Sequence, residues 1–187
     1  RRNLLGQFAE TSRPEFKLKH RVDEINRSTK WQYQVELFTP LKADQCLWGG
    51  LALPARSQRD LLDAIVGRIS KAVIDSINTA AIQPLIAHPL SNDKMSKKIY
   101  VLGQFLKQIG FEEVAMCSAL RRLQDLRSKS AAHRRGTDYE KLVRKIGGEQ
   151  LVWDYVQANI KTLIDELDAL KLHLTPKINF SAEDLNL

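Results

Sequence analysis

The spacing of the apolar residues constrains the fold more than any other feature of this chain. In several long segments these residues recur at steps of three and four, which is the spacing of one face of an α-helix. The first such segment follows Ser57, a residue type that caps helices, and ends near Ala81, because Pro84 and Pro89 come soon after. The pattern therefore predicts a first long helix over 57–81.

Further helical segments follow, separated by glycine. A second helix is predicted from Asn92 or Asp93 to Ile109, where Gly110 ends it, and a third begins after Phe111. Two more helices are expected, over 138–145 and 149–172. The sequence therefore predicts an all-α bundle of four or five helices, with its longest pairs antiparallel.

The first 56 residues do not follow this pattern. Residues 1–30 are polar and are expected to form an arm or a short helix followed by a loop. Large apolar and polar residues alternate over 31–37, which is typical of a half-buried strand, and Pro40 then breaks the alternation. Residues 48–54 are expected to form a second short strand or an irregular segment. We therefore expect three parts: an arm and small cap with a short strand or hairpin over 1–56, a helical domain over 57–175, and a tail over 176–187.

Composition excludes several classes of protein. The sequence has no run of about 20 apolar residues, so no membrane helix is expected, and no secretory signal is visible. Cys46 and Cys117 form no CxxC pair or zinc-like cluster, which favours a reducing, cytoplasmic setting and argues against a metal site. Cys117 lies among apolar helix positions, so we expect it in the core and not as a nucleophile. The glycine-rich signatures of nucleotide-binding and hydrolase sites are missing, so no cofactor is expected.

Positive charge is concentrated in one stretch. Residues 121–145 contain nine Lys or Arg and three acidic residues, a net charge of +6, whereas the whole chain carries +7. The segment from residue 146 to the end contains three Lys and seven acidic residues, a net charge of −4. Clustered basic charge attracts polyanions, because neutralising phosphates drives nucleic-acid affinity. The stretch is therefore a candidate nucleic-acid interface.

Arg127 and His133 are the candidate catalytic residues in this stretch. A guanidinium offers a permanent charge and a planar set of donors that fits phosphate, and an imidazole exchanges protons near neutral pH. RNA supplies its own nucleophile, the ribose 2′-OH. Six residues of regular helix turn through about 240° and rise about 9 Å. The two side chains therefore share no face of one helix, so either the helix breaks near Ser128 to Ser130 or the site is composite.

Arg127 is followed directly by a polar residue, and five residues, including that one, separate it from His133. This pattern resembles the signature of the HEPN superfamily (higher eukaryotes and prokaryotes nucleotide-binding). Here Ser128 occupies the polar position, where the family often has Asn, Asp or His. The resemblance includes the all-helical context and covers roughly residues 57–172.

The resemblance implies a metal-independent endoribonuclease that works as a homodimer, in which two copies of the motif meet in one basic cleft. Arg127 and His133 would be catalytic, Ser128 auxiliary, and cleavage would leave a 2′,3′-cyclic phosphate. HEPN ribonucleases commonly act as toxins or antiphage-defence effectors, which implies control by the N-terminal cap or by a regulatory domain or partner outside this chain. The residues expected to hold the RNA are Lys129, Arg134, Arg135, Arg121, Arg122, Arg144 and Lys145.

Two other functions stay open at this stage. A non-catalytic HEPN-like module would hold RNA or a nucleotide on the same basic stretch, or mediate assembly, without cleavage. A helical partner domain would instead dock its basic face on an acidic protein surface. Tyr139 could stack on a base, although a helix-packing role is the simpler interpretation.

Overall fold

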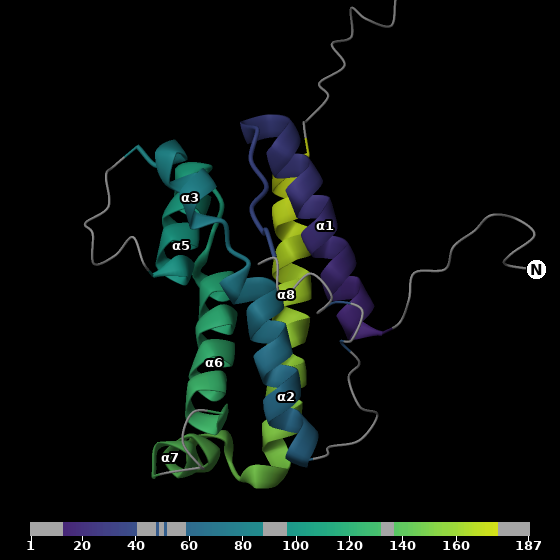
Figure 1. Ribbon diagram of the computed structural model, residues 1–187, viewed down its shortest axis with the longest axis vertical. Coiled ribbons are helices and arrows are strands. Elements are labelled where there is room, and N and C mark those ends of the chain that lie inside the picture. The colour runs from purple at the N-terminus through teal and green to yellow at the C-terminus, as the bar shows by residue number, and fades with distance from the viewer. Residues whose placement is uncertain are drawn as a thin grey trace, which may run out of the picture.

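The computed structural model describes residues 13–40, 48, 51, 59–87, 97–131 and 137–175. Over these residues the chain forms helices and no strand, so the predicted all-α bundle is confirmed (Figure 1). The elements in chain order are α1 (Pro14–Tyr33), α2 (Arg59–Ser70), the π-helical segment η2 (Lys71–Asp75), α3 (Thr79–Ile82), the 3₁₀ turn η3 (Gln83–Leu85), α5 (Lys98–Gln108), α6 (Val114–Ala131), α7 (Thr137–Ile146), the 3₁₀ turn η4 (Glu149–Leu151) and α8 (Val152–Leu174).

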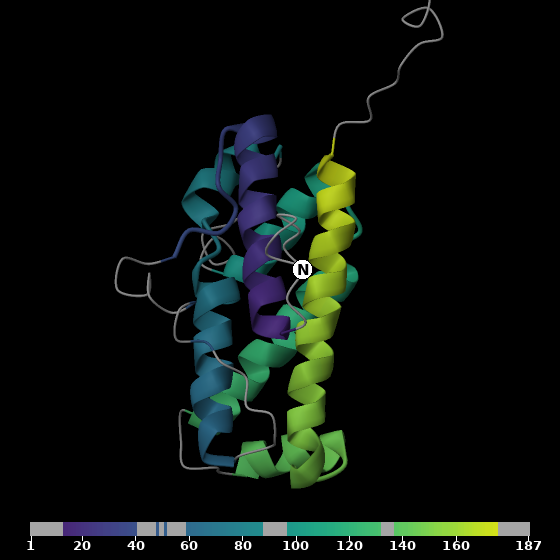
Figure 2. The ribbon, with the colours of Figure 1, turned by 90° about the vertical axis from the view of Figure 1, so that its right-hand side faces the viewer.

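Helices α6 and α8 form an antiparallel pair, as the sequence predicts for the long helices. The imidazole Nε2 of His173, at the end of α8, lies 2.8 Å from the carbonyl oxygen of Ile109, shortly before α6 begins. Tyr155, near the start of α8, lines a pocket with Arg122 and Lys129 from the second half of α6. The short helix α7 lies across the end of the bundle where these two helices are joined (Figures 1 and 2).

Helix α1 is a full member of the bundle and packs along α8. Leu18, Val22 and Ile25 recur at helical spacing and are almost completely buried. Arg21 pairs with Asp168, and the ammonium of Lys171 lies 2.6 Å from the carboxylate of Glu24. Because both partners advance along the chain together, α1 and α8 are parallel, so the expectation that the longest pairs are antiparallel was wrong for these two helices. The expectation of an arm or a short helix over 1–30 was therefore wrong for the part that the structure describes.

The strand predicted over 31–37 was also wrong. Trp31, Gln32 and Tyr33 form the last turn of α1, where Tyr33 packs edge-on against Phe105 with 5.6 Å between ring centroids. Gln34 ends the helix with a φ of 62°, in the left-handed region. Packing of the helix on α8 overrides the local alternation of side chains, because tertiary contacts outweigh weak β-propensity. Within the described residues, the one β-type contact is an isolated bridge between Phe38 and Ile77.

The helix predicted over 57–81 ends earlier than expected. After α2 the backbone widens into η2, and the Ser76 hydroxyl donates to the carbonyl of Ala72 over 2.5 Å. The Asn78 side chain then accepts a hydrogen bond from the backbone N–H of Ala81 and caps α3. Serine and asparagine compete for backbone hydrogen bonds in this way, which explains the break.

The remaining helices agree with the predicted pattern. Gly110 ends the α5 region with a φ of 77°, and Cys117, Leu120, Leu123 and Leu126 of α6 are buried. Val114, at the start of the same helix, is in contrast 57% exposed. Most of residues 48–54, the proposed caps at 92 and 93, and the tail over 176–187 lie outside the described residues.

Candidate nucleic-acid interface

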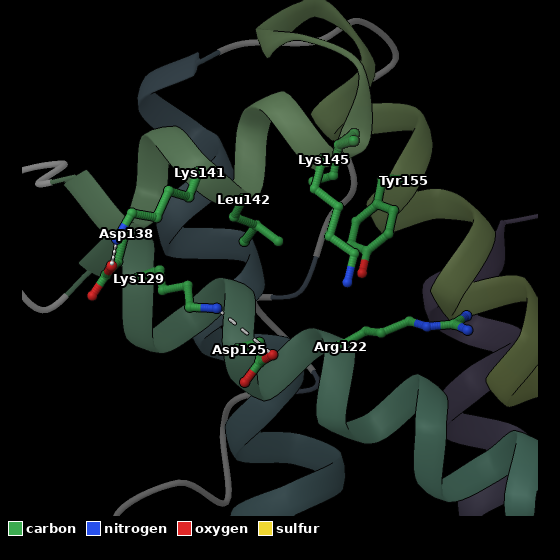
Figure 3. A pocket seen from close by; sticks show the side chains of 9 residues that line it. Arg122, Asp125, Lys129, Asp138, Lys141, Leu142, Lys145 and Tyr155 are labelled. Carbon is green, nitrogen blue, oxygen red and sulfur yellow. Dashed lines mark hydrogen bonds and ion pairs between the residues drawn. The ribbon is translucent and has the colours of Figure 1, made fainter.

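A basic pocket lies where α6, α7 and the start of α8 meet. Its volume is about 560 Å³, within the size range of small-ligand sites. Figure 3 shows side chains from all three helices around it. The residues that line it are Arg122, Asp125, Lys129, Asp138, Lys141, Leu142, Lys145, Ile146 and Tyr155.

Helical spacing explains why these side chains gather. Arg122 and Lys129 are seven residues apart, about two turns, and therefore share one face of α6. On α7, Lys141 and Lys145 are four residues apart and again share a face. α7 crosses the end of α6 (Figure 1), and the cationic residues of both helices line the same pocket.

Acidic residues neutralise only part of this charge. Lys129 lies 3.8 Å from a carboxylate oxygen of Asp125, and Lys141 lies 3.2 Å from one of Asp138. Among the described residues, Arg122 and Lys145 have no ion-pair partner. The pocket therefore holds four cations and two carboxylates, and an anionic ligand would complete its charge balance.

Tyr155 adds a neutral hydrogen-bonding group to the pocket. Burial raises the pKa of this phenol, and the charge of Asp125 acts in the same direction, although Arg122 partly opposes them. The hydroxyl therefore stays protonated at neutral pH and can donate a hydrogen bond. Leu142 and Ile146 supply apolar wall beside it.

Arg127 lies on a different face of α6 from this pocket. Two residues of helix separate it from Lys129 by about 200° of rotation. Its Nη1 donates to the carboxylate of Asp75 over 2.9 Å, at the end of η2. Arg121 also faces this side, where it lines a second hollow with Asp75, Lys98 and other residues. The predicted cationic site is therefore divided between two faces.

The structure also settles where the helix carrying Arg127 ends. α6 continues without interruption through Ala131, so a break near Ser128 to Ser130 is excluded. The Ser128 hydroxyl donates to the backbone carbonyl of Asp125 over 3.0 Å, a local bond that gives no sign of an auxiliary role. His133, Arg134 and Arg135 lie outside the described residues.

Arg144 and Tyr139, two residues of α7 considered in the sequence analysis, lie outside the lining of the basic pocket. Arg144 is exposed, lies 3.9 Å from a carboxylate oxygen of Glu140 and does not line the basic pocket. Tyr139 is buried, and its hydroxyl donates to Glu149 over 3.1 Å, so its packing role is confirmed.

Sequence reasoning did not select Lys141, Tyr155 or Asp75 as site residues. Lys141 could have been found from its four-residue spacing to Lys145. Asp75 carried no such signal, because 52 residues separate it from Arg127 in the sequence.

Other kinds of chemistry find little support in the described part of the chain. It contains no group of three His, Cys, Asp or Glu side chains able to hold a metal ion. Burial raises the pKa of the Cys117 thiol to about 11, which makes it a poor nucleophile. None of the helices in these ranges has the length and apolar character needed to cross a membrane.

Comparison with known proteins gives no match. No family model matches the sequence, and neither a curated protein nor a solved structure is significantly similar to it.

Proposed function

We propose that this chain is a metal-independent endoribonuclease of the HEPN type. The observation that carries the proposal is the basic pocket between α6, α7 and α8. Lys129 and Asp138 both line this pocket, and His133 lies within the short segment that connects them. The pocket is therefore lined by α6 and α7, the two helices between which the proposed base lies in the sequence.

In the proposed mechanism His133, with its imidazole neutral, accepts the proton of a ribose 2′-OH. The 2′ oxygen forms a bond to the adjacent phosphorus, and the bond from phosphorus to the 5′ oxygen breaks. Arg127 stabilises the negative charge that develops on the phosphoryl oxygens. A second His133, from the other copy of a homodimer, protonates the leaving 5′ oxygen. The products are a 2′,3′-cyclic phosphate and a 5′-hydroxyl end.

The pocket cations hold the RNA backbone in this proposal. Arg122, Lys129, Lys141 and Lys145 supply phosphate contacts, which position the chain without reading its sequence. DNA has the same phosphates but no 2′-OH, so it would bind and stay intact. Cytoplasmic action as a toxin or antiphage-defence effector, controlled by a further domain or partner, belongs to the same proposal and comes from the family resemblance.

The test is RNA cleavage in excess EDTA by the wild type, Arg127→Ala and His133→Ala. Each substitution should lower the rate by about 100-fold or more, about 3 kcal/mol of barrier, as loss of a comparable catalytic donor does. Mass spectrometry should detect the cyclic phosphate, and a DNA strand of the same sequence is the matched control. Unchanged cleavage by His133→Ala would contradict the proposed base, and loss of wild-type cleavage in EDTA would contradict the metal-free mechanism.

A second candidate is a module that binds RNA or a nucleotide without cutting it. Two observations favour it: Arg127 is already paired with Asp75, and it lies away from the basic pocket. Under this alternative, RNA binding depends on the pocket cations while Arg127→Ala and His133→Ala change nothing. Tight, salt-dependent binding with no turnover would therefore select this function over the first.

A further inference from the structure

The ion pair between Asp75 and Arg127 links the end of η2 to α6, on a different face of α6 from the basic pocket. The Arg127 Nη1 and a carboxylate oxygen of Asp75 are 2.9 Å apart. Both side chains are partly covered, with 33% of the arginine and 29% of the aspartate exposed. A long arginine side chain has many rotamers in solution, and a fixed carboxylate reduces that freedom.

Asp75 is itself held in place by its surroundings. It closes η2, a π-helical segment, and such segments occur frequently at functional sites. The ammonium of Lys98, in the first turn of α5, donates to the backbone carbonyl of Asp75. Three neighbouring residues before it, Ala72, Val73 and Ile74, are buried. The carboxylate is therefore presented to α6 from a packed part of the core.

The pairing leaves Arg127 able to bind an anion. A guanidinium has five N–H donors, and the recorded bond to Asp75 uses Nη1. Its remaining donors can bind a phosphoryl oxygen while the carboxylate holds the side chain in one orientation. Preorganised donors of this kind stabilise a transition state because they need no reorientation during the reaction.

We infer that Asp75 is a positioning residue that orients Arg127 for catalysis; this inference rests on the proposed function. Asp75 touches neither RNA nor the reacting atoms, and acts through the guanidinium. Its loss lowers the rate of cleavage and leaves the affinity for RNA unchanged, because the pocket cations that hold the backbone lie on another face of α6.

The experiment measures kcat and RNA affinity for Asp75→Asn in the full chain, with affinity determined in the His133→Ala background. We expect kcat to fall by about tenfold to 100-fold, as a displacement of about 1 Å at a catalytic group does. The Kd for RNA should stay within about twofold, and Asp75→Glu should recover part of the rate. In the Arg127→Ala background Asp75→Asn should cause no further loss, because the two residues act as one unit.

Asp168→Asn is the matched control, because it removes a partly exposed carboxylate that pairs with Arg21 far from the site. It should leave kcat unchanged, and thermal unfolding of both variants shows whether either has lost its fold. Two outcomes would overturn the inference and leave the proposed function standing. One is unchanged or faster cleavage by folded Asp75→Asn. The other is that Asp75→Asn lowers the rate as much in the Arg127→Ala background as in the wild type. Absence of cleavage by the wild type would overturn the proposed function, and the inference with it.

Discussion

Arg144 and Lys145 are neighbours in the sequence but have different surroundings on α7. Lys145 lines the basic pocket, whereas Arg144 is exposed beside Glu140. The sequence predicted both as RNA contacts, because a count of charges cannot tell which face of a helix meets another element. Replacing either residue with alanine removes one positive charge, so a difference between the two variants tests the pocket itself.

Lys145→Ala should weaken RNA binding, and Arg144→Ala should leave it nearly unchanged. Removing one phosphate contact lowers the slope of log K against log salt by about 1 and weakens binding for all sequences alike. Fluorescence anisotropy with a labelled RNA at several salt concentrations measures both quantities. Equal losses for the two variants would mean that the pocket is not the binding surface and that the whole face of α7 acts through its net charge.

The residues of the site could be predicted only in part. The basic stretch and the apolar face of α6 were visible in the sequence, since charge and helical period are local properties. Helix geometry alone places Arg122 and Arg127 on different faces of α6, but it does not predict which element packs against each face. Asp75 reaches Arg127 through the packing of α2 against α6, which no local pattern encodes.

At the scale of elements, α6 and α1 explain why some helices were predicted and others were not. α6 carries an uninterrupted apolar stripe, so its period was clear. α1 carries few apolar residues, and its buried face includes Glu15 and Thr29. Its charged side chains pair along the helix and across to α8, as with Glu24 and Lys171. A helix that is stabilised by ion pairs beside a narrow apolar stripe shows only weak apolar periodicity in its sequence.

Glu24 lies at the centre of these ion pairs between α1 and α8. Burial alone would raise the pKa of its carboxyl, but hydrogen bonds from Lys171 and Arg21 and the charges of Lys171 and His20 outweigh burial and lower it. A lowered pKa in the folded state means that ionised Glu24 stabilises the fold. This stabilisation is complete above its ordinary value of 4.5 and is lost as the pH falls through the folded-state pKa.

Glu24→Gln should therefore lower the melting temperature at pH 7, and the difference from the wild type should shrink below pH 4.5. Thermal unfolding across this range, followed by circular dichroism, measures the effect. Asp23→Asn is the matched control on the same helix, because its ion pair with Lys19 is exposed and contributes little. A constant difference between Glu24→Gln and the wild type at all pH values would contradict this account.

At the scale of the whole molecule, the core extends across the boundary that the sequence suggested near residue 56. Leu18, Val22 and Ile25 of α1 belong to the same buried cluster as Leu163 and Leu167 of α8. Full burial of such side chains contributes about 1.5–3 kcal/mol each. Three of them together approach the whole stability of a typical domain, about 5–15 kcal/mol.

A fragment comprising residues 57–187 should therefore not fold cooperatively. We expect low helicity, a broad thermal transition and aggregation, because α8 would expose the face that α1 covers. Adding a peptide of residues 13–40 should restore helicity and a sharp transition. Circular dichroism and calorimetry measure both, and a fragment that melts as the full chain does would contradict a shared core.

The parallel pairing of α1 with α8 has a consequence for how the protein is made. Glu24 and Lys171 are 147 residues apart in the chain, so the first of these two helices leaves the ribosome long before its neighbour is synthesised. At about 5–20 residues per second, α1 waits roughly 7 to 30 seconds with its apolar side exposed. During translation this helix is therefore available to chaperones, and its pairing with α8 forms only after α8 has been synthesised.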